Sequence, residues 1–299
     1  MKSIAGLSFA FWPPQGASPA KRPIVALHGL LGSHKNFAGF ASAFSAQGHP
    51  VICFDCRNHG ESFHDTRFDY FVMAADLESS LAGLAALRYG GIDWQKVILL
   101  GHSMGGRTAF VYALLYPQRL AGLIGVDIAP SRHNPDPGIL PIVRAMRRTQ
   151  ASLAGISGRK EAEHILLREL GEYYSPSIVS FLLLCNLKRL DSGAYAWRCN
   201  LKVIEESLDQ IICWPAEQLA GYPAVYLPLL LIVGGRSPYV EPQGWELLLE
   251  YFPHCEATLQ DQNAAPSIKK VIADSYHWPH TEAPEEFRTL IAEFLDSLS

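Results

Sequence analysis

The stretch LLGHSMGGRTAF, at residues 99–110, constrains the fold more than any other part of this chain. It ends an apolar run, opens a segment with helical spacing, and sets Ser103 between Gly101 and Gly105. A sharp strand-to-helix turn of the form G-x-S-x-G needs small residues on both sides of the serine, because the two backbones approach closely. Such a turn lifts the hydroxyl to the N-terminus of the helix, where negative charge is favoured. The pattern predicts a nucleophilic serine, with a purely structural turn as the alternative.

Strand and helix patterns alternate along the first 130 residues. Short apolar runs are typical of buried strands, and apolar residues at helical spacing are typical of helices packed against them. The strands are expected at 7–12, 23–29, 49–57, 96–103 and 121–130, and the helices at 36–47, 69–90 and 104–117. This rhythm predicts an α/β fold with a mostly parallel sheet and helices on both faces.

The alternation of strand and helix patterns ends after residue 130. Long helical segments with more charge and proline follow, and no clear strand run interrupts them before residue 226. A strand pattern returns at 227–235, a weaker strand is expected at 255–260, and an amphipathic helix at 284–298. We therefore expect an α/β core made of residues 1–130 and 226–299, with residues 131–225 inserted as a helical cap.

Composition excludes several classes of partner. The net charge is −4 and no long run has one sign, so neither nucleic acid nor a membrane surface is expected to bind. No apolar run approaches the roughly 20 residues that span a bilayer. Trp12-Pro13-Pro14 directly follows the N-terminal apolar run without a small-residue cleavage site, so we expect a strand there and a cytoplasmic protein. The 6 cysteines are scattered, and Cys53-x-x-Cys56 has no second pair, so neither a disulfide scaffold nor a metal is expected.

A nucleophilic serine needs a base, and the base needs an orienting acid. The expected chain order is serine, acid, histidine. His277, in DSYHWPHTEAP before the last helix, is the candidate base, with His280 as the alternative. The turn after 227–235 reads GGRSPYVEP and offers only Glu241 as an acid. Asp127 is the other candidate, because a carboxylate near the end of the apolar strand LIGVDIAP is costly unless it is paired.

The oxyanion formed on attack needs two backbone N–H donors. One is expected from Met104, directly after the nucleophile, and the other from Leu30 in the loop HGLLGS. His28 opens that loop, and we expect it to brace the loop by hydrogen bonds rather than to act as a base.

Four motifs together carry a resemblance to a known family: HGLLGS at 28–33, DCRNHGES at 55–62, GHSMGG at 101–106 and YHWPHTEAP near the end. With VDIAP and GGRSPYV, the chain resembles the α/β-hydrolase superfamily, and more narrowly its small bacterial esterases and related eukaryotic serine hydrolases. The resemblance implies the α/β-hydrolase fold with a cap inserted after the sixth strand, and Asp127 as the acid. It also implies acyl ester or thioester substrates, including acyl-coenzyme A, and no cofactor.

Two further groups of residues lie beside the expected site. The pair Trp197-Arg198 matches a W-R-x-N stretch of the same branch and is expected either to line the pocket or to pack within the cap. The polar residues of DCRNHGES are expected to stabilise a loop rather than react: Asp55, Arg57, Asn58 and His59.

The sequence therefore predicts a serine carboxylesterase or thioesterase that works through an acyl-enzyme, on small-molecule acyl substrates. A cofactor-free haloperoxidase or perhydrolase would use the same three residues. A carbon–carbon hydrolase or lyase is favoured only by Arg107, because an arginine beside the serine turn can bind a carboxylate. A small-molecule receptor on the same fold is the alternative from another class.

Overall fold

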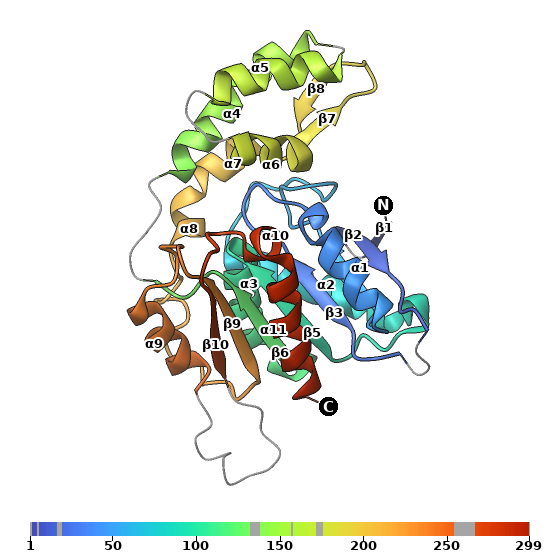
Figure 1. Ribbon diagram of the computed structural model, residues 1–299, viewed down its shortest axis with the longest axis vertical. Helices are drawn as coiled ribbons and strands as arrows, with labels where there is room; N and C mark the ends of the chain where they lie inside the picture. Colours follow the sequence, from blue (N-terminus) through green and yellow to red (C-terminus); the bar gives the residue numbers. More distant parts are fainter. Residues whose placement is uncertain are drawn as a thin grey trace.

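The structure, a computed structural model, describes residues 2–4, 6–16, 20–131, 138–156, 158–171, 176–253 and 267–298. One 8-stranded sheet forms its centre (Figure 1). Its strands are β1 (Lys2–Ile4), β2 (Leu7–Trp12), β3 (Ile24–Leu27), β4 (Val51–Phe54), β5 (Val97–His102), β6 (Leu120–Val126), β9 (Leu229–Gly234) and β10 (Ile268–Ile272). The order across the sheet is β1-β2-β4-β3-β5-β6-β9-β10. β2 pairs antiparallel with β1 and β4, and all other pairs are parallel, as the strand-helix rhythm predicts.

Helices cover both faces of the sheet. The larger apolar core lies under α2 (Tyr70–Ala86), α3 (Met104–Leu115) and α9 (Pro242–Tyr251), and the other lies under α1 (Ala38–Ala46) and α11 (Pro284–Asp296). Neighbouring residues of β5 enter opposite cores, Leu99 the first and Leu100 the second. A strand that is buried on both faces needs a continuous apolar run, which is why this segment shows no alternation. Short helices complete the core: η1 (His34–Phe37), η2 (Tyr89–Gly91), η3 (Pro117–Arg119) and α10 (Pro279–Glu282).

The segment between β6 and β9 forms a separate layer at one end of the sheet (Figure 1). Its helices are α4 (Ile139–Ala154), α5 (Arg159–Gly171), α6 (Pro176–Asn186), α7 (Leu201–Glu206) and α8 (Leu208–Ile212). We call this layer the cap. It also contains a hairpin of β7 (Leu187–Arg189) and β8 (Tyr195–Trp197), so the expectation that no strand interrupts this segment is wrong. Strands of 3 residues are too short to show a period of two.

The edge strand β10 (Ile268–Ile272) is not among the strands that the sequence predicts. The strand expected at 255–260 lies outside the described residues, and the described edge strand is β10. Lys269 and Lys270 are exposed on this strand and interrupt its apolar pattern. Charged residues on an edge strand discourage pairing with another strand. The sequence of an edge strand therefore shows a weaker strand pattern than the apolar run of a central strand. No helix among the described residues is long and apolar enough to cross a membrane.

Candidate active site

The turn between β5 and α3 has the strained geometry that its sequence predicts. Ser103 has φ 53° and ψ −118°, in a region that residues other than glycine rarely adopt. A Cβ atom on Gly101 would lie 2.2 Å from the carbonyl oxygen of Gly105, and one on Gly105 would lie 2.4 Å from that of Leu27. Both contacts are too short for any side chain, so the glycines allow the tight turn that holds Ser103 at the start of α3.

Ser103 lines a cavity of about 410 Å³ between the core and the cap. The core contributes residues from the turns that follow five of its strands, and the cap contributes residues of α4, α6 and α8. Ligands of open α/β sheets bind at the carboxyl ends of the strands, which is where these turns lie. The candidate residues that line this cavity are Leu30, Ser103, Met104, Arg107 and His277.

A buried carboxylate holds the candidate base. Asp127 directly follows β6, is 0% exposed and has φ 48°. Its Oδ2 lies 2.7 Å from Nδ1 of His277, and its Oδ1 accepts a hydrogen bond of 2.9 Å from the N–H of Gly234. The hydroxyl of Ser237 also donates to Oδ2. A carboxylate with these three donors stays oriented, and it leaves Nε2 of His277 for a proton from the cavity.

The alternative acid and base that the sequence offers lie in surroundings different from those of Asp127 and His277. Glu241, the other candidate acid, is exposed at the N-cap of α9, while Asp127 holds His277. His280, the other candidate base, is buried and stacks on Phe37 at 4.9 Å between ring centroids. Burial, together with His277, lowers the pKa of His280 to about 3. A neutral imidazole packed against a phenyl ring, outside the cavity lining, is suited to packing rather than to proton transfer.

Three residues that support this arrangement were not singled out from the sequence for these roles. The ring of Tyr239 stacks on His277 with 3.8 Å between centroids and 18° between planes. Nε2–H of His102 donates to the carbonyl oxygen of His277 at 2.7 Å. Tyr239 therefore holds the ring of His277 and His102 holds its backbone. The hydroxyl of Ser237 holds Asp127, the acid that pairs with His277. Ser237 and Tyr239 lie in GGRSPYV, a motif for which the sequence predicts no role in holding the base.

The candidate oxyanion donors both line the cavity. Met104 is the first residue of α3, so its N–H has no acceptor within the helix. Leu30 lies in the loop after β3, where Nδ1–H of His28 donates to the carbonyl oxygen of Gly29 at 2.8 Å. Nε2 of His28 accepts from the N–H of Cys56 at 3.0 Å. His28 therefore braces the loop as a neutral ring, and burial lowers its pKa.

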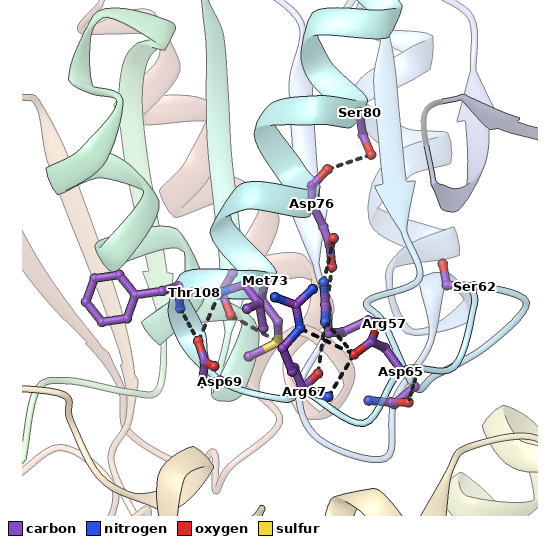
Figure 2. A network of polar contacts seen from close by, with 12 residues as sticks. Arg57, Ser62, Asp65, Arg67, Asp69, Met73, Asp76, Ser80 and Thr108 are labelled. Atoms are coloured by element: carbon purple, nitrogen blue, oxygen red, sulfur yellow. Dashed lines mark hydrogen bonds and ion pairs between the residues drawn. The ribbon is translucent and has the colours of Figure 1, made fainter. Parts of the chain in front are cut away.

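The loop that follows β4 is fixed beside the site. The guanidinium of Arg57 binds Asp76 of α2 through Nε and Nη2, at 2.6 and 2.8 Å, as Figure 2 shows. Its Nη1 donates to the carbonyl oxygen of Arg67 at 2.9 Å. The buried carboxylate of Asp55 accepts from the N–H groups of His34 and Glu61, at 2.7 and 2.9 Å. These contacts are structural, in line with the prediction for DCRNHGES.

The three candidate substrate contacts have different positions. Arg107 lines the cavity, and its Nη1 donates to the carbonyl oxygen of Ile212 at 2.6 Å. Trp197 belongs to the cap hairpin, where its Nε1–H donates to the carbonyl oxygen of Met146 at 2.7 Å. Arg198 forms an ion pair with Glu61 of the core. Trp197 and Arg198 are not among the cavity-lining residues, so of the three only Arg107 reaches the cavity.

No group of three or more His, Cys, Asp or Glu side chains among the described residues could hold a metal ion. Cys53 and Cys56 are buried free thiols, and burial raises the pKa of both. The side chains gathered at this cavity could support acid-base chemistry on a serine.

Comparison with known proteins agrees with this geometry. A family model described as the alpha/beta hydrolase fold matches residues 22–157. The sn-1-specific diacylglycerol lipase ABHD11 of Xenopus tropicalis is 31% identical, over 98% of this chain and 83% of that protein. Esterase YbfF of Escherichia coli K12 is 31% identical, over 92% of this chain and 93% of that protein. A solved marine microorganism esterase superposes with a TM-score of 0.78 at 28% identity, over 98% of this chain and 100% of that one.

The chain belongs to the α/β-hydrolase fold family, and the predicted fold is confirmed. The three relatives named above are two esterases and a lipase, so the predicted class of carboxylesterase-type hydrolase is confirmed as well. The roles of the individual site residues remain predictions, which the geometry above supports.

Proposed function

We propose that this protein hydrolyses acyl esters and thioesters through an acyl-enzyme formed on Ser103. The observation that carries the proposal is the pairing of His277 with the buried Asp127 at 2.7 Å, in the cavity that Ser103 also lines. A serine hydroxyl at a strained turn, a histidine on a buried carboxylate, and backbone donors at the same cavity are the parts that acyl transfer needs.

In the proposed reaction, Ser103 attacks the acyl carbonyl carbon while Nε2 of His277 takes its proton. The N–H groups of Leu30 and Met104 bind the oxyanion of the tetrahedral intermediate. The carbon–oxygen or carbon–sulfur bond then breaks, and His277 returns the proton to the leaving alcohol or thiol. Water attacks the acyl-enzyme by the same steps. Asp127 holds the productive tautomer of His277 and stabilises the imidazolium.

The cavity walls indicate the kind of acyl group. Ile139 and Ile142 of α4, Phe181 of α6, and Ile211 and Ile212 of α8 line the side that faces the core. Such a surface favours an apolar acyl chain, because apolar contact is gained when water is displaced. The names of the relatives, a diacylglycerol lipase and an esterase, support ester substrates of this kind.

The test is turnover together with covalent labelling of the nucleophile. Purified protein should hydrolyse p-nitrophenyl esters of graded acyl length and be labelled by a fluorophosphonate probe. Ser103→Ala should lose labelling and at least about a thousandfold in kcat. Ser79→Ala, which removes an exposed serine of α2, serves as the matched control and should change neither. Labelling that persists in Ser103→Ala would refute the proposal, and binding of apolar acids without turnover by the wild type would favour a receptor.

A parallel panel of acyl-coenzyme A thioesters decides between an alcohol and a thiol as the leaving group.

We further propose that the protein is cytoplasmic. The five cysteines of the described residues, all free thiols, support this proposal. The sixth, Cys255, lies outside the described residues.

A further inference from the structure

The oxyanion loop contains a strained residue directly after its candidate donor. Leu31 is 1% exposed and has φ 60°, a left-handed conformation that is uncommon for a side chain of this size. A residue in this region persists only when its surroundings hold it there. Leu30 directly precedes Leu31, and in the proposed function its N–H binds the oxyanion of the reacting carbonyl. The groups that hold Leu31 therefore bear on the direction of the Leu30 N–H.

Two side chains hold the backbone of Leu31. Its N–H donates to Nε2 of His59 at 3.1 Å, and its carbonyl oxygen accepts from Nδ2–H of Asn186 at 2.7 Å. On the other side of Leu30, the carbonyl oxygen of Gly29 accepts from Nδ1–H of His28 at 2.8 Å and from the N–H of Gly32 at 3.0 Å. Leu30 thus lies between two anchored peptide groups.

The tautomer of His59 is fixed by a second contact. Nδ1–H of His59 donates to the carbonyl oxygen of Arg57 at 3.0 Å, so Nε2 carries the lone pair that accepts from Leu31. Burial, with His28 nearby, lowers the pKa of His59 to about 3, which keeps the ring neutral. Arg57 is itself held by Asp76, so the acceptor is attached to a rigid loop (Figure 2).

The two holding residues come from different layers of the molecule. His59 lies in the core loop after β4, whereas Asn186 is the last residue of α6 in the cap and is 0% exposed. The same core loop also binds the cap, because Nδ2–H of Asn200 donates to Oδ1 of Asn58 at 3.1 Å. The backbone of the oxyanion loop is therefore fixed from both the core and the cap.

We propose that His59 and Asn186 are positioning residues for the oxyanion hole, which hold Leu31 left-handed and so aim the N–H of Leu30 at the reacting carbonyl. The inference rests on the proposed function, and it gives the cap a part in catalysis besides forming a wall of the cavity. Neither side chain lines the cavity, so their effect on substrate would be indirect.

The test compares two variants of His59 that differ in where they place an acceptor. The amide oxygen of His59→Gln reaches the position of Nε2, whereas the shorter side chain of His59→Asn reaches only that of Nδ1. With p-nitrophenyl butyrate, kcat should fall about tenfold or more in His59→Asn, with KM unchanged, and stay within about threefold of wild type in His59→Gln. Affinity for an alkyl boronic acid, which forms a tetrahedral adduct on the serine, should fall in parallel with kcat.

Asn186→Leu tests the cap side independently, because leucine has a similar volume and cannot donate. It should lower kcat and boronate affinity by a similar factor. His49→Asn is the control: His49 is also buried and hydrogen-bonded to a carbonyl oxygen, that of Arg22, but it lies outside the site. His49→Asn should lower the melting temperature without lowering kcat. All assays are run below the melting temperature of every variant.

The inference is overturned if folded His59→Asn and Asn186→Leu keep wild-type kcat and boronate affinity, or if only KM changes. It is also overturned if His59→Gln is as impaired as His59→Asn. Failure of the proposed function is visible separately, because the wild type itself would then neither hydrolyse esters nor bind the boronic acid.

Discussion

The core and the cap build opposite sides of one cavity in different ways. The core supplies the polar groups, on turns at strand ends, together with apolar side chains such as Ile128. Hydrogen bonds fix the positions of the polar groups, as Asp127 fixes His277. The cap supplies apolar side chains on helices, such as Ile142 and Phe181. Bond making needs groups within a fraction of an ångström of their place, whereas an apolar wall needs only approximate shape. We therefore expect changes in the core to decide whether the reaction occurs, and changes in the cap residues that line the cavity, unlike Asn186, mainly to decide which acyl group reacts.

The largest effect is expected at the core acid. Asp127→Asn keeps the shape but favours the wrong tautomer of His277, so kcat should fall about 10⁴-fold. Stopped-flow or extended-time assays with p-nitrophenyl butyrate measure it. Glu241→Gln is the matched control and should leave kcat within about twofold, because Glu241 is exposed at the N-cap of α9. The opposite result would place the acid in the turn after β9.

A smaller core effect is expected at the hydroxyl that binds this acid. Ser237→Ala removes the donor to Oδ2 of Asp127, and kcat/KM should fall about 10- to 100-fold, as for other hydrogen bonds to a charged group. Ser237→Thr keeps a hydroxyl and should recover most of the activity. If the alanine and threonine variants are equally impaired, the loss comes from packing in this turn and not from the hydrogen bond.

The buried His280 of the core should make the stability of the fold depend on pH in acid. His280 has a pKa of about 3 when folded, against 6.5 ordinarily, so between these values the unfolded chain binds a proton that the folded chain does not. The free energy of unfolding should therefore fall as pH drops through this window, with this residue contributing up to about 1.4 kcal/mol per pH unit. His280→Phe keeps an aromatic ring beside Phe37 and should flatten the dependence between pH 6 and 4. Urea unfolding at each pH measures it, and an unchanged slope would contradict the assignment.

The smallest effect is expected in the apolar wall that the cap contributes to the cavity. Phe181→Ala enlarges the cavity on its α6 side, so the ratio of kcat/KM for long over short acyl esters should rise about threefold to tenfold. Leu167→Ala, an exposed truncation on α5, is the control and should not change the ratio. If Phe181→Ala lowers kcat equally for all chain lengths, the division of labour between core and cap does not hold.

Much of the fold and the main site residues could be predicted from the chain alone, because the signals are local. Gly101 and Gly105 flank Ser103 within five residues, and each central strand is a continuous apolar run. Asp127 stands out because a carboxylate at the end of such a run demands a partner. The structure places this residue, Ser103 and His277 at the same end of the sheet.

Other parts could not be predicted, because their roles arise from contacts distant in sequence. Ser237 meets Asp127 across 110 positions, and His102 meets His277 across 175. Neither residue type signals such a contact by itself. The sequence predicts Trp197 either in the pocket or packed within the cap, and only tertiary contacts separate the two: Trp197 donates to Met146 and does not line the cavity.

Ser103 and Asp127 both have a backbone conformation that residues with a side chain seldom adopt. Ser103 has φ 53° and Asp127 has φ 48°, so two residues of the proposed chemistry have a strained backbone. A lineage released from selection for turnover could accept glycine or asparagine at these positions and gain heat resistance.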